Sequence, residues 1–141
     1  MVPRWAEATM RELLCAKCIN NPQPGRRGCR ADHVGKLIET WVYQQLRPEV
    51  DLQPLWQIHH FRSSNKREID FLLVNNERGE LLGIEVKASQ KVSSEDFVHL
   101  TWFAEKCKGR KFTGIVFYTG NLVTRGGENL YGIPMACSWE D

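Results

Sequence analysis

The sequence lacks any apolar run near the ~20 residues that a helix needs to cross a membrane. Its first residues also lack the charged-then-apolar layout of a secretory signal peptide. We therefore expect a cytoplasmic protein without a membrane partner. A large excess of one charge sign is lacking too, because the formal net charge is only +2. Such a small excess does not by itself indicate nucleic-acid binding, so any basic surface has to be local.

Paired cysteines are also lacking, because the chain has five, an odd number that argues against a disulfide framework and fits a reducing compartment. Four residues near the start nevertheless have the ligand types of a structural zinc site, namely Cys15, Cys18, Cys29 and His33. The stretch that holds the first two also has the pattern of an amphipathic helix, in which cysteine acts as a small hydrophobic residue. We favour this inert interpretation over zinc.

The length of 141 residues, with 42% hydrophobic and 26% charged residues, is typical of one compact soluble domain. Residues 1–30 are predicted to form a helix and a loop rich in proline and glycine, and in a fragment they could be the tail of a preceding domain. Residues 31–141 are predicted to form the domain proper. Nothing in the sequence indicates the oligomeric state.

Hydrophobic periodicity predicts two helices and about five strands in this domain. The first helix starts at Asp32 or His33 and stops before Pro48, and the second runs from a capping box at Ser93 to about Lys108. The predicted strands are residues 55–61, 67–74, 82–87, 112–120 and 130–134. The order α, three strands, α, two strands predicts an α/β fold with a mixed central sheet flanked by helices.

The stretch from Arg67 to Lys87 has the most informative pattern. Asp70 alternates with apolar residues in the first predicted strand, while Glu85 and Lys87 share one face of the second. A polar turn over residues 75–80 joins the two strands. If they pair as a hairpin, an acid of one strand lies beside an acid and a lysine of the next.

Such a cluster has a chemical use. Two neighbouring carboxylates repel one another unless a cation lies between them, and oxygen ligands suit a hard ion such as Mg²⁺. A lysine beside the metal can orient an attacking water and neutralise charge on a phosphate. By alternation alone, however, a half-buried hairpin with a solvated polar face is favoured. Spacing does not distinguish the two interpretations.

Other polar residues lie close to this hairpin in the sequence or border an apolar face. Glu39 borders the apolar stripe of the first helix, where a carboxylate is costly unless it finds a partner, although a solvated glutamate explains it equally simply. Arg62, Lys66 and Arg67 form the densest set of phosphate donors in the chain, or an ordinary solvated loop. Glu68 is a spare acid that we expect to be peripheral.

Two adjacent histidines precede the basic loop. On a strand, only one of His59 and His60 can face a site. We favour a surface or core position over metal binding for both.

The order Glu39 on a helix, Asp70 on a strand and Glu85-Val86-Lys87 on the next strand resembles the PD-(D/E)xK nuclease-like superfamily. More narrowly, the chain from Gly35 onward, about three-quarters of its length, is similar to the DUF4143 domain found at the C-terminus of many prokaryotic AAA-type ATPases. The matching segments are GKLIETWVYQQL, FRSSNKREIDFLLV, GIEVKASQKVSSEDFVHL, GIVFYTG and YGIPM.

This resemblance implies a restriction-endonuclease-like αβββαβ core and a Mg²⁺- or Mn²⁺-dependent endonuclease that hydrolyses phosphodiester bonds, in DNA rather than RNA. By the same resemblance, Asp70, Glu85 and the carbonyl of Val86 would hold the metal, Glu39 would complete its shell, and Lys87 would activate water. Related nucleases often have a polar residue just after the lysine, which makes Gln90 a weaker candidate.

The resemblance also implies an ATPase partner, but no P-loop of the form GxxxxGK(S/T) occurs in this chain. The chain is then either a fragment or a free-standing version of the domain. Two alternatives to catalysis stay open. One is a silent nucleic-acid- or protein-binding module on a nuclease-like scaffold, and the other is an assembly domain whose lysine and carboxylates form a structural ion-pair network.

Overall fold

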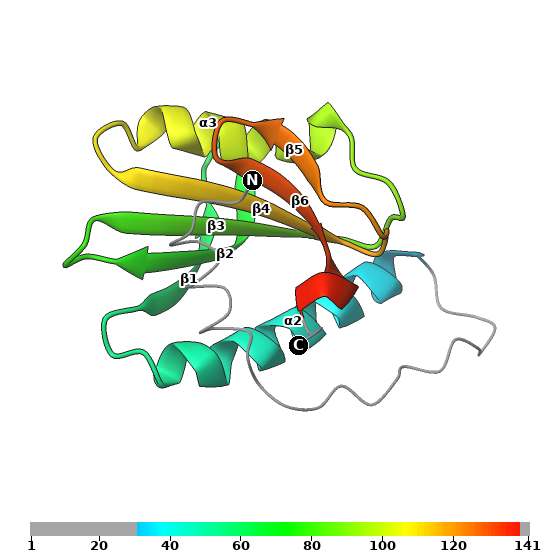
Figure 1. The fold of residues 1–141 in the computed structure, drawn as a ribbon, viewed down its shortest axis with the longest axis horizontal. Coiled ribbons are helices and arrows are strands. Elements are labelled where there is room, and N and C mark those ends of the chain that lie inside the picture. The colour runs from blue at the N-terminus through cyan, green and yellow to red at the C-terminus, as the bar shows by residue number, and fades with distance from the viewer. Residues whose placement is uncertain (1–30, 139–141) are drawn as a thin grey trace.

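The computed structural model describes residues 31–138, and Figure 1 shows their fold. Two α-helices, six strands and two short 3-10 helices follow in the order α2 (Ala31–Asp51), β1 (Gln57–Arg62), β2 (Glu68–Asn75), β3 (Glu80–Lys87), η1 (Ser94–Phe97), α3 (Val98–Lys106), β4 (Lys111–Tyr118), β5 (Thr124–Gly127), β6 (Leu130–Pro134) and η2 (Met135–Ser138). The predicted N-terminal helix and Cys15, Cys18 and Cys29 of the zinc set lie outside the described residues, as does the side chain of His33.

The strands form one open mixed sheet in the order β1-β2-β3-β4-β6-β5. The β1/β2, β2/β3 and β5/β6 pairs are antiparallel, whereas β3/β4 and β4/β6 are parallel. The predicted α/β fold with a mixed sheet flanked by helices is therefore confirmed. The prediction missed β5, because its four residues TRGG show no apolar alternation.

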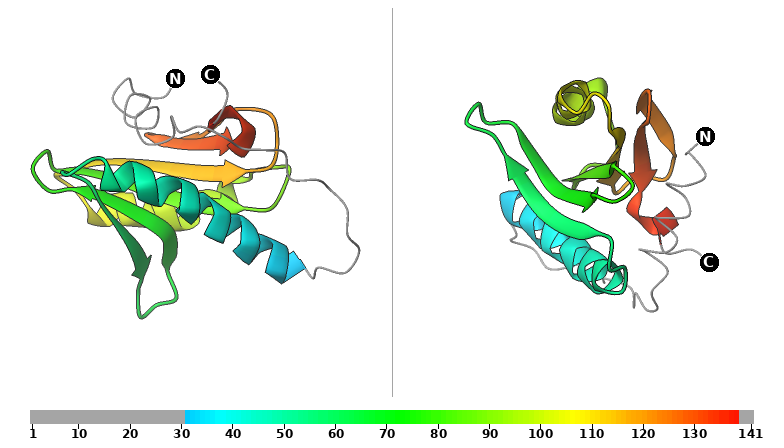
Figure 2. Two further views of the ribbon diagram at one scale, coloured as in Figure 1. Left: turned by 90° about the horizontal axis from the view of Figure 1, so that it is seen from below. Right: turned by 90° about the vertical axis from the view of Figure 1, so that its left-hand side faces the viewer.

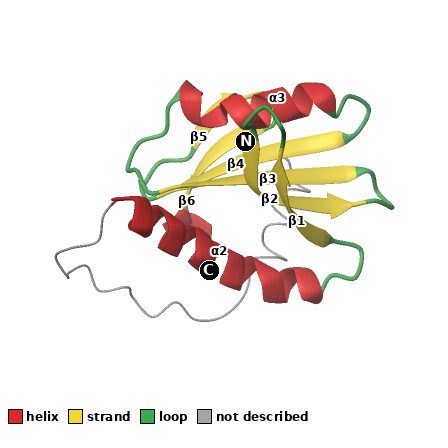
Figure 3. Ribbon diagram, turned by 180° about the vertical axis from the view of Figure 1, so that it is seen from behind, coloured by secondary structure: helices red, strands yellow, loops and turns green. Residues whose placement is uncertain are grey.

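The sheet lies between the two helices, with α2 on one face and α3 on the other (Figures 1 and 3). Leu73 and Ile84 pack in the cluster beneath α2, whereas Leu72 and Leu81 pack in the cluster beneath α3. Since both faces are covered, the central strands are nearly continuous apolar runs. Among the described residues, no helix has the length and apolar character to cross a membrane.

The end of α2 differs from the prediction. The helix continues past Pro48 to Asp51, although proline removes one hydrogen bond from its last turns. The residues around the proline explain this, because Leu46 and Val50 are almost fully buried in the core. The free energy of burying these side chains outweighs the lost bond.

A close approach fixes α3 on the sheet. Leu100 is fully buried, and a Cβ atom added at Gly83 of β3 would lie only 2.9 Å from its Cδ2 atom. Only glycine leaves room for the helix at this separation. The first turn of α3 is therefore held directly over β3.

The β2–β3 hairpin is regular at its turn and open at its other end. Residues 76–79 form the turn, where the Arg78 amide donates to Asn75 Oδ1 at 3.1 Å and Gly79 has a φ of +63°. Pairing runs from Asn75 with Glu80 to Phe71 with Ile84. These pairs set the register that brings the candidate site together.

Beyond Phe71 the two strands separate. The first residues of β2 pair with β1, as Arg62 with Glu68, whereas β3 continues beside β4 as far as Lys87 with Tyr118. A register irregularity lies in β1 between His59 and Phe61, and the β1–β2 turn projects away from the rest of the sheet (Figure 2). A gap in the pairing therefore opens between the start of β2 and the end of β3.

Candidate functional site

Asp70 lies at the point where β2 leaves β3. Its Oδ2 atom accepts a hydrogen bond of 2.7 Å from the amide of Val86, in place of a backbone carbonyl. Because Val86 directly follows Glu85, this bond brings the Asp70 side chain to the residues of the predicted Glu85-Val86-Lys87 motif. The juxtaposition that the hairpin pattern predicted is present in the structure.

Glu85 is the most deeply buried of the acids, with 5% of its surface exposed. Lys87 Nζ lies 3.6 Å from its Oε2 atom, and the Lys87 side chain itself is 38% exposed. His99 Nδ1 of α3 lies 3.3 Å from Oε1. Two different elements therefore contact the two oxygens of one carboxylate.

The contact between His99 and Glu85 is not a hydrogen bond. His99 Nδ1 is only 2.8 Å from the carbonyl oxygen of Glu68, and this carbonyl takes the ring hydrogen. Glu85 Oε1 is consequently buried without a hydrogen-bond partner among the described residues, despite the nearby nitrogen. A buried carboxylate oxygen in this state is costly, so it favours an added proton or a cation.

The electrostatics of the pair reflect this cost. Burial raises the pKa of Asp70 to about 6, and the Val86 hydrogen bond only partly offsets it. Burial and the charge of Asp70 raise the pKa of Glu85 to about 8, against the opposing effect of Lys87. Without a cation, therefore, the two carboxyl groups are not both ionised at neutral pH.

Glu39 is on α2 and is half-buried. Its charge contributes to the raised pKa of Asp70, which places the two carboxylates within electrostatic range. The partly buried Val86 packs against the cluster beneath α2, on the side of the sheet that Glu39 approaches. Glu39 thus lies near the acids without a contact as close as that of Val86 with Asp70.

The acids can supply only part of a metal shell. Within residues 31–138, no three or more His, Cys, Asp or Glu side chains are arranged to hold a metal ion together. Asp70 and Glu85 offer two carboxylates, and Mg²⁺ commonly uses one or two protein carboxylates with waters and substrate phosphate as its other ligands. The unpartnered Oε1 of Glu85 fits such a cation.

Comparison with known proteins gives one match. Residues 34–138 match the family described as "Domain of unknown function (DUF4143)", which covers about three-quarters of the 141-residue chain. The chain belongs to the DUF4143 family. No curated protein and no solved structure matches it. The family match includes every residue placed in the site above.

The three basic residues of the predicted phosphate-binding loop of this DUF4143 domain have different surroundings. Arg62 Nε lies 4.0 Å from Glu68 Oε2, in an exposed ion pair. The Arg67 guanidinium lies over the ring of Trp102, 5.8 Å from its centroid. Lys66 is exposed and has a φ of 58° in the turn. Glu68, expected to be peripheral, has an exposed side chain.

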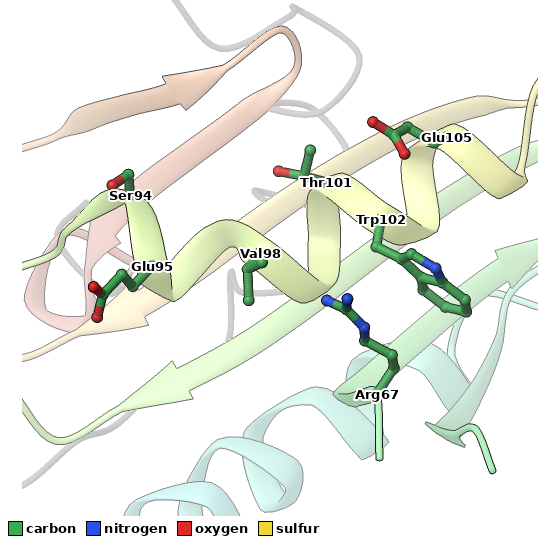
Figure 4. Close-up of a pocket in the computed structure, with 7 residues that line it drawn as sticks. All are labelled: Arg67, Ser94, Glu95, Val98, Thr101, Trp102 and Glu105. Carbon is green, nitrogen blue, oxygen red and sulfur yellow. The ribbon is translucent and has the colours of Figure 1, made fainter. Parts of the chain in front are cut away.

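A surface pocket of about 450 Å³ lies along α3 of the DUF4143 domain (Figure 4). Figure 4 shows the Arg67 guanidinium beside the Trp102 ring. The lining residues are Arg67, Ser94, Glu95, Val98, Thr101, Trp102 and Glu105. None of the four predicted catalytic residues is among them, so Asp70 and Glu85 do not line this pocket.

The remaining sequence candidates, two histidines and a glutamine, are exposed. His59 and His60 are both exposed, and the centroid of the His60 ring lies 5.3 Å from that of the Phe71 ring. Gln90 is exposed in the segment after β3.

Sequence reasoning missed His99. Its only sequence signal is its position one residue before the buried Leu100, at the edge of the apolar face of the helix. Nothing in the sequence shows that this edge lies against Glu85 of the DUF4143 domain.

Proposed function

We propose that this DUF4143 domain is a metal-dependent phosphodiesterase of the PD-(D/E)xK type that acts on DNA. The observation that carries the proposal is the Glu85 carboxylate, which is 5% exposed and has no hydrogen-bond partner for Oε1 among the described residues. Asp70 lies beside it through the bond to the Val86 amide. A buried carboxylate with a second, partly buried carboxylate beside it is explained by a divalent cation between them.

The mixed sheet flanked by helices supports the same proposal, because it agrees with the restriction-endonuclease-like core that the resemblance implies. The acids lie on adjacent strands of one hairpin, and Glu39 approaches from the preceding helix. This is the order of elements that the PD-(D/E)xK resemblance predicts.

In the proposed reaction, Asp70, Glu85 and the carbonyl of Val86 would hold Mg²⁺ or Mn²⁺, and Glu39 would complete the shell or hold a metal-bound water. The metal would supply Lewis-acid stabilisation of the charge that builds up on the phosphate. The ammonium group of Lys87 lies 3.6 Å from Glu85, and the Lys87 side chain is 38% exposed and so is accessible from solvent. Lys87 therefore orients the attacking water and hydrogen-bonds a phosphate oxygen.

The step balances without a further reactant. The water oxygen forms a bond to phosphorus while the bond from phosphorus to the leaving sugar oxygen breaks. The water gives up a proton to solvent, and the leaving oxygen takes one from solvent.

A silent binding module is the second candidate, and one observation favours it. Lys87 and His99 already contact both oxygens of Glu85, so the cluster is partly compensated without metal. In this case the loop with Arg62, Lys66 and Arg67 would bind nucleic acid or a protein without catalysis. In either case the resemblance implies an AAA-type ATPase as a partner.

Calorimetric titration of Mn²⁺ tests the proposal. We expect saturable binding to the wild type and to Glu77→Gln, whose acid lies in the exposed β2–β3 turn, and none to the isosteric double variant Asp70→Asn, Glu85→Gln. Mn²⁺-dependent nicking of plasmid DNA should follow the same pattern. A folded wild type that binds no Mn²⁺ would exclude the metal site.

Lys87→Met separates the two candidates. An enzyme should keep Mn²⁺ binding in this variant and lose cleavage by at least about 100-fold, since a group that stabilises transition-state charge is gone. A silent module should show no cleavage in the wild type either, with salt-dependent DNA binding that survives Lys87→Met.

A further inference from the structure

We infer that His99 is a positioning residue for the metal site, which holds Glu85 in its metal-binding orientation through Nδ1. This inference rests on the function proposed above. It adds a residue from α3 to a set that the hairpin and α2 otherwise supply.

The contacts of the ring fix its tautomer. A backbone carbonyl can only accept a hydrogen bond, so the 2.8 Å contact of His99 Nδ1 with the Glu68 oxygen places a hydrogen on Nδ1. The same N–H lies 3.3 Å from Glu85 Oε1. It therefore attracts the carboxylate without occupying the lone pair that a cation needs.

The packing of α3 on β3 fixes the backbone of His99. His99 precedes Leu100, which is fully buried and packs on β3 where Gly83 leaves space. The side chain of His99 has 33% of its surface exposed. A side chain whose backbone is this well fixed is suited to orienting another residue.

The position of His99 also bears on the spacing of the two acids. Glu68 begins β2 and Glu85 is near the end of β3, on either side of the gap where these strands stop pairing. One ring nitrogen contacts both residues. His99 therefore bridges the gap, alongside the hydrogen bond from the Val86 amide to Asp70.

Three substitutions of His99 test this role by Mn²⁺ calorimetry. The side-chain nitrogen of Asn takes roughly the place of Nδ1, whereas that of Gln takes roughly the place of Nε2. Because partners of metal ligands typically contribute 10- to 100-fold to metal affinity, His99→Ala and His99→Gln should weaken Mn²⁺ binding by about this factor. His99→Asn should bind almost as well as the wild type.

Controls separate this inference from a merely structural role and from the function itself. Thr101→Ala, an exposed position on the same helix, should leave the Kd for Mn²⁺ unchanged. Thermal unfolding monitors folding of each variant, and a purely structural His99 would lower the melting temperature of His99→Ala without changing the Kd of the folded protein.

Two results would overturn the role of His99 while leaving the metal site intact. One is an unchanged Kd in all three His99 variants, and the other is rescue by Gln alone, which would indicate that Nε2 and not Nδ1 is the nitrogen that matters. A wild type that binds no Mn²⁺ would instead refute the proposed function.

Discussion

The metal-free protein should lose stability as the pH rises. Replacing Glu85 with Gln should remove most of this loss. Burial and the charge of Asp70 raise the pKa of Glu85 from 4.5 to about 8 in the folded state. The folded protein therefore keeps a proton that the unfolded chain has released. The stabilising contribution of this proton is complete below the ordinary pKa and is lost as the pH rises through the folded value.

The size of the effect follows from the interval between the ordinary pKa of Glu85 and its raised pKa in the folded protein. Each pH unit between the two pKa values changes the free energy of unfolding by about 1.4 kcal/mol. From about pH 5 to pH 8 this amounts to roughly 2–4 kcal/mol, the lower figure allowing for solvent that screens the site. Asp70, whose pKa is raised to about 6, adds to the fall with the same sign. The charges that help to raise the Asp70 pKa come from Glu39 and Glu68, so this smaller part of the fall should remain in Glu85→Gln.

Urea unfolding of the wild type and Glu85→Gln, with a metal chelator at four pH values between about 5 and 8, measures the effect. Glu77→Gln removes an exposed acid from the β2–β3 turn and should show the wild-type pH dependence. The reasoning is refuted if the free energy of unfolding of the wild type is constant or rises over this range. It is also refuted if Glu85→Gln shows the same slope as the wild type.

Two further predictions concern metal linkage and packing. Because the raised pKa leaves Glu85 largely protonated at neutral pH, Mn²⁺ binding should release about one proton near pH 7. Calorimetry in buffers of different ionisation enthalpy should detect this proton, and a binding enthalpy independent of the buffer would contradict the prediction. Gly83→Ala places a Cβ atom 2.9 Å from Leu100 Cδ2 and should destabilise the fold by about 1–3 kcal/mol in urea unfolding, whereas Gly35→Ala, which has open space around it, should not.

The core of the fold and the hairpin acids could be predicted from the sequence. Successive side chains of a strand point to opposite faces, so position in β2 or β3 predicts which side chains share a face. A short turn makes antiparallel pairing of neighbouring strands the simplest outcome. This is why Asp70 and the Glu85-Val86-Lys87 motif were expected together. The bond from the Val86 amide to Asp70 realises that expectation.

Features that depend on tertiary packing could not be predicted. His99 contacts Glu85 only because α3 crosses β3 at Gly83, and no local pattern encodes this crossing. The continuation of α2 beyond Pro48 likewise depends on burial of Val50 in the core. The stacking of Arg67 of the basic loop on Trp102 also depends on where α3 packs, and no local pattern shows it.

The turn at residues 76–79 lies at the end of the hairpin away from the acids. Glu85 is five residues beyond Glu80, so about 17 Å of strand separates the turn from the site. Exposed turns of this kind accept inserted segments with little loss of stability. A fluorescent or affinity reporter grafted between Asn76 and Gly79 should therefore follow the domain in a larger assembly while leaving the carboxylates undisturbed.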